Sequence, residues 1–159
     1  MNPIARKTER GPVPFSVLHG LAVALVVTTA WAGLSPELQK ALDEASHVYI
    51  RSERKSGDFG APAEIWFWNE GGTVYVASPP TSWRVRRIEA GRARARIAIG
   101  KPKGPSFEAT GAIVKDPALE KRLMDTFAKK YPEGWKRHAE NFRTGFKDGK
   151  RVLIRYTSS

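Results

Sequence analysis

The sequence predicts a mainly β domain of the α+β class, a small antiparallel barrel of about six strands with packed helices. Short β-branched and aromatic runs alternate with turn-forming residues along most of the chain. Amphipathic helical segments stand before, between and near the end of these runs. At 159 residues the chain has room for one modest hydrophobic core. These observations together favour a single compact barrel.

The first 32 residues have the features of an export signal. Residues 1–14 are polar and basic, residues 15–34 carry no Asp, Glu, Lys or Arg, and Ala30-Trp31-Ala32 places small residues at a cleavage site. We therefore expect a signal peptide at residues 1–32 and an exported, periplasmic domain at residues 33–159. Two alternatives stay open: an N-terminal membrane anchor formed by residues 15–34, or a cytoplasmic protein whose start codon is assigned too far upstream.

The first expected helix begins with Ser35 as N-cap and Pro36 as first helical residue. The alternating run at residues 47–52 then predicts a strand that pairs with a second one at residues 63–68. This second strand and residues 73–78 form a hairpin, whose turn contains a Gly-Gly pair. The three strands are expected to form an antiparallel meander.

Four large apolar residues alternate along the strand at residues 63–68. Trp66 and Trp68 fall on one face, and Ile65 and Phe67 on the other. One pair is expected to fill the barrel, and the other to pack beneath a helix or against a second subunit. The same strand would also suit a planar ring system as a wall.

A basic segment follows the hairpin. Pro79-Pro80 prevents a further strand, and Thr81 or Ser82 then caps a short helix at residues 83–89. Arg84 and Arg87 lie one turn apart, beside these hydroxyls and the free N–H groups of the helix start. This combination favours phosphate binding. The alternative is an ordinary solvated helix face.

The rest of the chain continues the barrel. Arg and apolar residues alternate at 92–99, and a further strand is expected at 106–114. Asp116-Pro117 starts a helix that Pro132 ends, a second amphipathic segment follows, and a last strand is expected at 152–156.

Composition limits the classes of function. Residues 33–159 hold 24 basic and 15 acidic side chains, which favours an anionic partner such as a nucleotide cofactor, a nucleic acid or an anionic membrane. The absence of cysteine excludes disulfides and cysteine nucleophiles. The three histidines have no ligand-spaced neighbours, so no metal site is expected. An export signal argues against a nucleic-acid partner.

Several motifs together point to a known family. They are GAPAEIWFW in the hairpin, the run Tyr-Val-Ala-Ser, the run Ser-x-Arg-x-Arg-Arg-Ile, and the strand-then-helix ending ATGAIVKDPALEKRLMDTFAKKYP. In this order, residues 34–157 resemble the FMN-binding split-barrel family, which comprises pyridoxamine 5′-phosphate oxidase-like proteins and their deazaflavin-dependent relatives. The family often has Ser-x-Lys-x-x-x-Leu where this chain has Arg84.

The resemblance implies a split barrel that binds FMN, or alternatively a deazaflavin coenzyme of the F-420 type, in a homodimer with the cofactor at the subunit interface. It implies that the phosphate is held by Ser82, Arg84 and Arg87, with Arg51 as a further candidate. The ring would lie near Pro62, Glu64, Trp66, Ala77 and Ser78.

The function that the resemblance implies is an FMN-dependent oxidoreductase that transfers hydride to or from an unknown small substrate. The alternative is a non-catalytic flavin or haem binding or sensing protein of the same fold. No side chain stands out as a catalytic acid or base. Arg51 and Tyr75 are the nearest candidates to polarise a flavin carbonyl.

Overall fold

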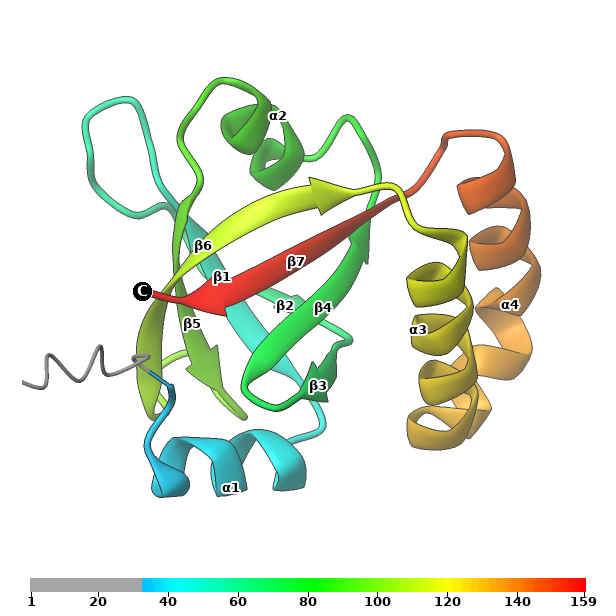
Figure 1. The fold of residues 1–159 in the computed structure, drawn as a ribbon, viewed down its shortest axis with the longest axis horizontal. Coiled ribbons are helices and arrows are strands. Elements are labelled where there is room, and N and C mark those ends of the chain that lie inside the picture. Colours follow the sequence, from blue (N-terminus) through cyan, green and yellow to red (C-terminus); the bar gives the residue numbers. More distant parts are fainter. Residues whose placement is uncertain (1–32) are drawn as a thin grey trace, which may run out of the picture.

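The protein is built on one antiparallel sheet of seven strands that curls into a half-barrel, with helices at its ends and on one side (Figure 1). The computed structural model describes residues 33–159. The strand order is β2-β1-β5-β6-β7-β4-β3. The helices are α1 (Pro36–Glu44), α2 (Trp83–Glu89), α3 (Pro117–Lys130) and α4 (Pro132–Lys147); the strands are β1 (Val48–Ser52), β2 (Ala63–Ile65), β3 (Trp68–Glu70), β4 (Thr73–Ser78), β5 (Arg94–Ile99), β6 (Ser106–Val114) and β7 (Val152–Ser158). This architecture confirms the expected split-barrel class.

The concave face of the sheet holds one hydrophobic core. Alternate residues of each strand turn inward, such as Val48 and Ile50 of β1 and Ile97 of β5, and all three are almost fully buried. Helices α1 and α2 lie at opposite ends of the half-barrel (Figure 1). Leu42 of α1 and Val85 of α2 enter this core with no exposed surface.

A second core lies between the convex face of the sheet and the helices α3 and α4, which run side by side (Figure 1). Leu123 and Phe127 of α3 pack there together with Phe142 of α4 and Tyr75 of β4. Asp116 caps α3 as expected, because its carboxylate accepts hydrogen bonds from the first free N–H groups of the helix.

The tryptophan pairs separate between the two cores as the alternation predicts. Trp66 and Trp68 pack with the helices α3 and α4, whereas Ile65 and Phe67 face the barrel interior. The turn of the β3–β4 hairpin also forms as expected. Gly71 and Gly72 have φ angles of 58° and 85°, a region that favours glycine.

The expected meander is wrong. The single strand predicted at residues 63–68 divides into β2, which pairs with β1, and β3, which pairs with β4, and these two strands lie at opposite edges of the sheet. The backbone between them is held by Tyr131, whose hydroxyl accepts from Phe67 N at 3.1 Å and donates to Ser46 O at 2.7 Å. β1 thus lies between β2 and β5, and β4 lies between β3 and β7.

The expected export signal or anchor at residues 1–32 lies outside the described residues. Within residues 33–159, no helix is both long and apolar enough to cross a bilayer.

Candidate functional site

A cavity of about 500 Å³ lies between α2 and the segment that leads into β2. It brings together four of the residues expected to bind the cofactor, Pro62, Ser82, Arg84 and Arg87. Ile50, Ser52, Arg54, Gly60, Ala61, Ala63 and Trp83 complete its lining. Ser82, Arg84 and Arg87, expected to bind the phosphate, therefore share one cavity with Pro62, expected near the ring.

Close packing of α2 on the sheet positions this cavity. A Cβ atom at Gly111 of β6 would lie 2.7 Å from the Tyr156 ring and 2.9 Å from Cδ1 of Ile88, so only glycine leaves room for both. Val85 and Ile88 of α2 bury their side chains towards the barrel. Arg84 and Arg87, on the flanks of the same helix, reach the cavity.

Two polar atoms of the cavity are buried without a partner. Oγ of Ser82 and Nη1 of Arg84 make no hydrogen bond within the described residues. Ser82 occupies the N-cap position of α2, yet its side chain does not form the usual cap bond. Burial lowers the pKa of Arg84, partly offset by the nearby Tyr156. Buried polar groups of this kind are normally paired, so both atoms are free to bind the acceptor oxygens of a ligand.

Arg87 is held in place at the cavity wall. Its Nη1 donates to Ser52 O at 2.9 Å, which directs the guanidinium past Gly60. A Cβ at Gly60 would lie only 2.9 Å from that same Nη1. Gly60 therefore shapes the cavity wall, a role that the sequence did not reveal although this residue stands at the start of the GAPAEIWFW motif.

A second cavity, of about 310 Å³, lies at the other end of β2. Glu64, Trp66 and Ala77, all expected near the ring, line it. His47, Ile65, Phe127, Phe142 and Arg151 complete the lining, so the walls are mainly aromatic and apolar. No pattern in the sequence singled out His47 or Arg151 for this site, and Arg151 is distant in the chain from β2.

This second cavity contains an acid–base pair. His47 Nε2 lies 4.0 Å from Oε1 of Glu64, and the Tyr49 hydroxyl donates a hydrogen bond to the other oxygen of the same carboxylate. That hydrogen bond raises the pKa of Tyr49, and burial raises it further. The Tyr49 hydrogen bond thus orients the Glu64 carboxylate, and the imidazole of His47 lies nearby.

Trp66 is a fixed wall of the second cavity. Its ring stacks on Tyr131, with centroids 4.5 Å apart and planes 6° apart, and on Phe142 at 6.1 Å. A Cβ at Gly134 of α4 would lie 2.4 Å from the indole, so the ring fits only against glycine. These ring contacts and the close approach of Gly134 leave Trp66 little freedom to move.

The split of the sheet lies along both cavities. β2 pairs with β1 on one side only, and β3 pairs with β4 only as far as Tyr75. The outer edge of β2 and the Val76–Ser78 edge of β4 therefore have no strand partner within residues 33–159. Backbone N–H and C=O groups at such edges can bind the polar rim of a ligand.

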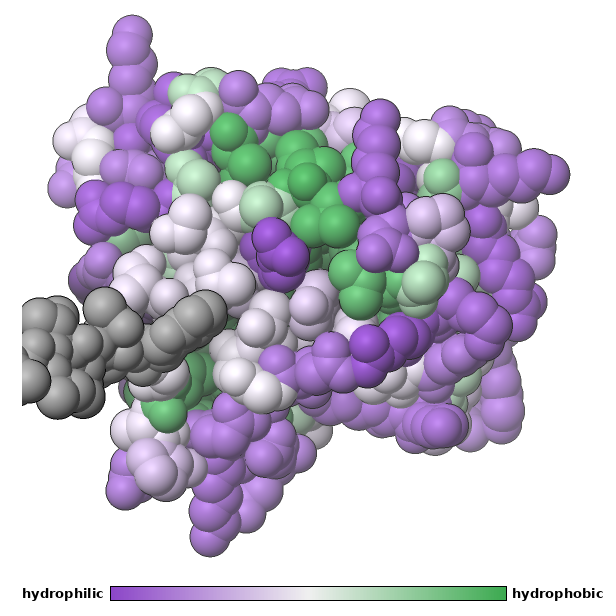
Figure 2. All heavy atoms as spheres, viewed as in Figure 1, coloured by the Kyte–Doolittle hydropathy of each residue, from purple (hydrophilic) through white to green (hydrophobic). Residues whose placement is uncertain are grey.

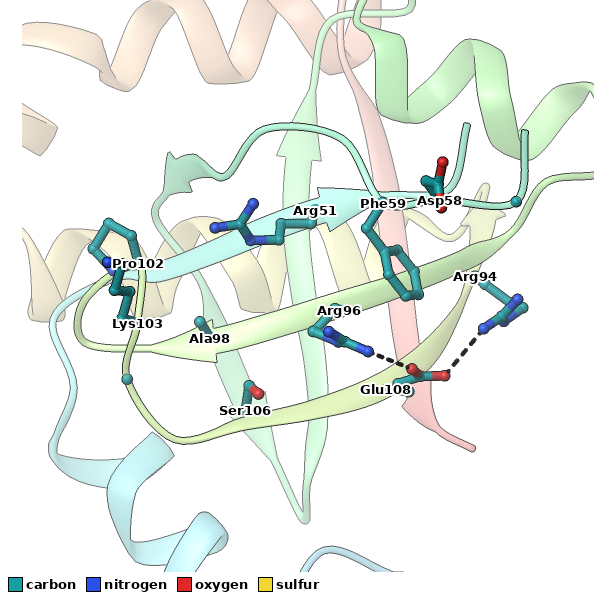
Figure 3. A pocket seen from close by; sticks show the side chains of 12 residues that line it. Arg51, Asp58, Phe59, Arg94, Arg96, Ala98, Pro102, Lys103, Ser106 and Glu108 are labelled. Carbon is teal, nitrogen blue, oxygen red and sulfur yellow. Dashed lines mark hydrogen bonds and ion pairs between the residues drawn. The ribbon is translucent and has the colours of Figure 1, made fainter. Parts of the chain in front are cut away.

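Three expected residues lie elsewhere. Arg51 points from the convex face of β1 into a cavity of about 750 Å³, with Arg96 and Lys103, and donates from Nη1 to Gly60 O at 3.3 Å (Figure 3). Ser78, 2% exposed, ends β4 outside the cavities. Tyr75 stacks on Trp68 beneath α3. Within residues 33–159 no group of three or more His, Asp or Glu side chains could hold a metal.

Comparisons with known proteins show the fold. Neither a protein-family model nor a curated protein sequence matches this chain. Among solved structures, it is similar to a conserved hypothetical protein of Mycobacterium tuberculosis, with a TM-score of 0.59, 15% identity, and 79% of this chain and 81% of that chain covered. It is also similar to a candidate pyridoxamine 5′-phosphate oxidase of Listeria innocua (TM-score 0.56, 15% identity, 77% and 91% covered). A third is HutZ, a haem storage protein of Vibrio cholerae (TM-score 0.57, 12% identity, 80% and 91% covered). The chain has the fold of the pyridoxamine 5′-phosphate oxidase-like split barrels.

Proposed function

We propose that this protein binds FMN along the split of its barrel and acts as an FMN-dependent oxidoreductase on a small substrate. The buried, unpaired Ser82 Oγ and Arg84 Nη1 carry this proposal, because a phosphate monoester supplies the acceptor oxygens that they lack. Arg87, fixed beside them by Ser52, adds a second positive charge. The residues present thus fit a phosphate group.

The position of the second cavity supports a ring system at the other end of the ligand. β2 connects the two cavities, since Ala63 lines the first and Glu64 and Ile65 line the second. A ligand with an anionic end and a planar aromatic end can lie along this edge, with the ring against the wall formed by Trp66 and Ala77. The unpaired backbone edges of β2 and β4 are available to its polar rim.

When bound, FMN supplies hydride-transfer chemistry, and the chain binds it, orients it and excludes water. His47 is the residue best placed to hold and deliver a proton in the second cavity, through Nε2. Glu64, whose carboxylate accepts a hydrogen bond from Tyr49, lies 4.0 Å from that atom. Replacing His47 by Ala should slow turnover and leave FMN affinity unchanged.

The second candidate function is a non-catalytic protein that stores or senses a flavin or haem. His47 favours it as well, because an imidazole beside an aromatic, mainly apolar cavity can ligate haem iron. The fold is also shared with the haem storage protein HutZ. Titration of the wild type and of His47→Ala with haemin distinguishes a haem-binding from a flavin-binding function. If the protein binds haem through His47, the wild type should show a Soret band that His47→Ala lacks.

We also propose that the protein is a homodimer with the cofactor at the subunit interface. Both cavities are open to the surface, and the β2 edge between them has no strand partner within the described residues. A second copy that covers this edge would exclude water from the ligand. Sedimentation equilibrium tests this proposal, and a monomer in the presence of saturating FMN would contradict it.

A further proposal concerns the localisation of the protein: residues 1–32 direct its export or its attachment to a membrane. It rests on the residue pattern alone. The mass of the mature protein after expression in a bacterial host distinguishes the alternatives. A chain that begins at Gly33 indicates a cleaved signal, and an uncleaved chain in the membrane fraction indicates an anchor.

The phosphate site is tested by titrating the full-length protein with FMN, riboflavin and a deazaflavin coenzyme, followed by flavin absorption and fluorescence. FMN should bind at least about 30-fold more tightly than riboflavin, since each lost charge-assisted hydrogen bond costs about 1.5–3 kcal/mol. The double variant Arg84→Ala/Arg87→Ala should weaken FMN binding by about 2–4 kcal/mol.

The control is Arg86→Ala, which removes one positive charge from an exposed position of the same helix that does not line the cavity. It should bind FMN like the wild type. Equal FMN affinity of the double variant and the control would remove the basis of the phosphate assignment. Reduction of the bound flavin by a nicotinamide donor then separates an enzyme from a storage protein.

A further inference from the structure

A third cavity, of about 560 Å³, lies where the end of β6 and the start of β7 meet the start of α3 and the end of α4. Its floor is apolar and is formed by Val114, Met124, Phe146 and Val152, all of them partly exposed. Figure 2 shows apolar surface over the end of β6 and the start of α3, bordered by hydrophilic side chains. We call this cavity the helix-end groove.

Cationic side chains surround the helix-end groove. Lys115, Arg143, Lys147 and Arg151 line it, against one carboxylate, Glu120. Arg143 faces Glu140 at 3.9 Å, and Arg151 donates from Nε to Asn141 O while its guanidinium lies over the Phe142 ring. Lys115 and Lys147 are exposed and make no ion pair within the described residues. The groove therefore has two uncommitted ammonium groups at its rim.

An apolar floor with a cationic rim matches one class of ligand in particular. A small polar anion would leave the floor of Val114, Met124 and Phe146 exposed, and a neutral hydrocarbon would leave the lysines without a counter-charge. The volume of the groove lies within the range of about 300–1,000 Å³ that small-molecule sites occupy. A concave site of this size suits a single chain better than a bilayer surface.

We propose that the helix-end groove binds a fatty acid, with its hydrocarbon chain on the apolar floor and its carboxylate between Lys115 and Lys147. This inference is independent of flavin binding, since none of the phosphate-site residues lines the groove. Arg151 lines both the groove and the second flavin cavity, so the two sites are neighbours.

The probe for this site is 11-(dansylamino)undecanoate, whose fluorescence rises in an apolar environment. The full-length protein should bind it saturably, and dodecanoate should displace it. Dodecyltrimethylammonium, which has the same tail and the opposite charge, should displace it poorly, and acetate should not displace it at all. Equal displacement by dodecanoate and by the cationic amphiphile would overturn the proposal, because the rim charges would then play no part.

Variants locate the binding, which matters because the apolar residues 15–34 can also attract an amphiphile. Lys115→Ala/Lys147→Ala should weaken dodecanoate binding at least about fivefold, as expected for two solvent-exposed charge interactions. Glu120→Gln, which removes the opposing carboxylate, should strengthen it about twofold on the same basis.

The matched control is Lys40→Ala/Lys55→Ala, which removes two exposed lysines far from the groove in sequence and outside its lining. Its affinity for dodecanoate should equal that of the wild type. All these side chains are exposed or half-buried, so circular dichroism should show folded protein in each case. An unchanged affinity of Lys115→Ala/Lys147→Ala would refute the groove as the binding site.

Discussion

Replacing Arg84 by Met tests whether Arg84 serves to bind a ligand or to stabilise the fold. The guanidinium of Arg84 is largely buried, and its Nη1 has no hydrogen-bond partner within the described residues. Met keeps a flexible apolar chain of similar length and removes the unpaired charged donor. If Arg84 exists to bind a phosphate, the variant should lose cofactor affinity and gain stability in the absence of cofactor.

The expected magnitudes follow from the state of this one donor. A buried unsatisfied polar group costs about 1–3 kcal/mol, so the free energy of unfolding without FMN should rise by about 1 kcal/mol. Loss of charge-assisted hydrogen bonds to the phosphate should cost about 2 kcal/mol of binding, or roughly 30-fold in Kd. At an FMN concentration of 100 times the wild-type Kd, FMN stabilises the wild type by about 2.7 kcal/mol and the variant by only about 0.9 kcal/mol.

The order of stability should therefore reverse on adding FMN. Urea unfolding followed by tryptophan fluorescence measures this, with the variant more stable without FMN and the wild type more stable with it. Arg86→Met serves as the control, because Arg86 is exposed and outside the cavity, and it should leave both curves unchanged. If Arg84→Met were less stable without FMN and bound FMN like the wild type, Arg84 would be a structural residue.

Two further predictions concern the cavity wall and pH. Gly60→Ala should fold normally but weaken FMN binding by roughly fivefold, because the new Cβ would displace the Arg87 guanidinium from Ser52. An unchanged Kd in the flavin titration would show that Arg87 does not contact the ligand. Burial lowers the pKa of Lys130 from 10.5 to about 8 and raises those of Tyr131 and Tyr156 from 10.0 to about 12. Between pH 8 and 10 the unfolded chain holds the Lys130 proton that the folded chain has released, so the free energy of unfolding should rise with pH by about 1 kcal/mol. Above pH 10 the free energy of unfolding should fall, because the two tyrosines lose their protons first in the unfolded chain. Urea unfolding at a series of pH values tests both the rise and the fall of the unfolding free energy. If the rise between pH 8 and 10 persisted in Lys130→Met, another group would be its cause.

Much of the site could be predicted because its parts are close in the chain. Ser82 stands directly before the short helix that carries Arg84 and Arg87, so cap preference and helical spacing alone indicate that the three act together. The alternation of Trp66 and Phe67 likewise assigns them to opposite faces whatever the pairing of the strand.

Other parts could not be predicted, because they depend on contacts between distant segments. Alternation places Arg51 on the face of β1 opposite to Ile50, but only the position of α2 at one end of the barrel decides which of these faces borders the cavity beside α2. The break between β2 and β3 likewise depends on Tyr131, which is 64 residues away from Phe67 in the chain. The Tyr131 hydroxyl accepts the hydrogen bond from Phe67 N that a neighbouring strand would otherwise accept. No local pattern encodes such a bond.

The sequence by itself determined the elements, their faces and the cluster of cationic residues on α2, because periodicity, caps and turn residues act over a few neighbouring positions. The tertiary structure alone decided which strand edges stay open, which donors are buried without a partner, and that His47 and Arg151 meet at Trp66. The physical reason is that burial and strand pairing are properties of the whole sheet: a residue's partner is chosen by the packing of segments that the chain brings together only on folding.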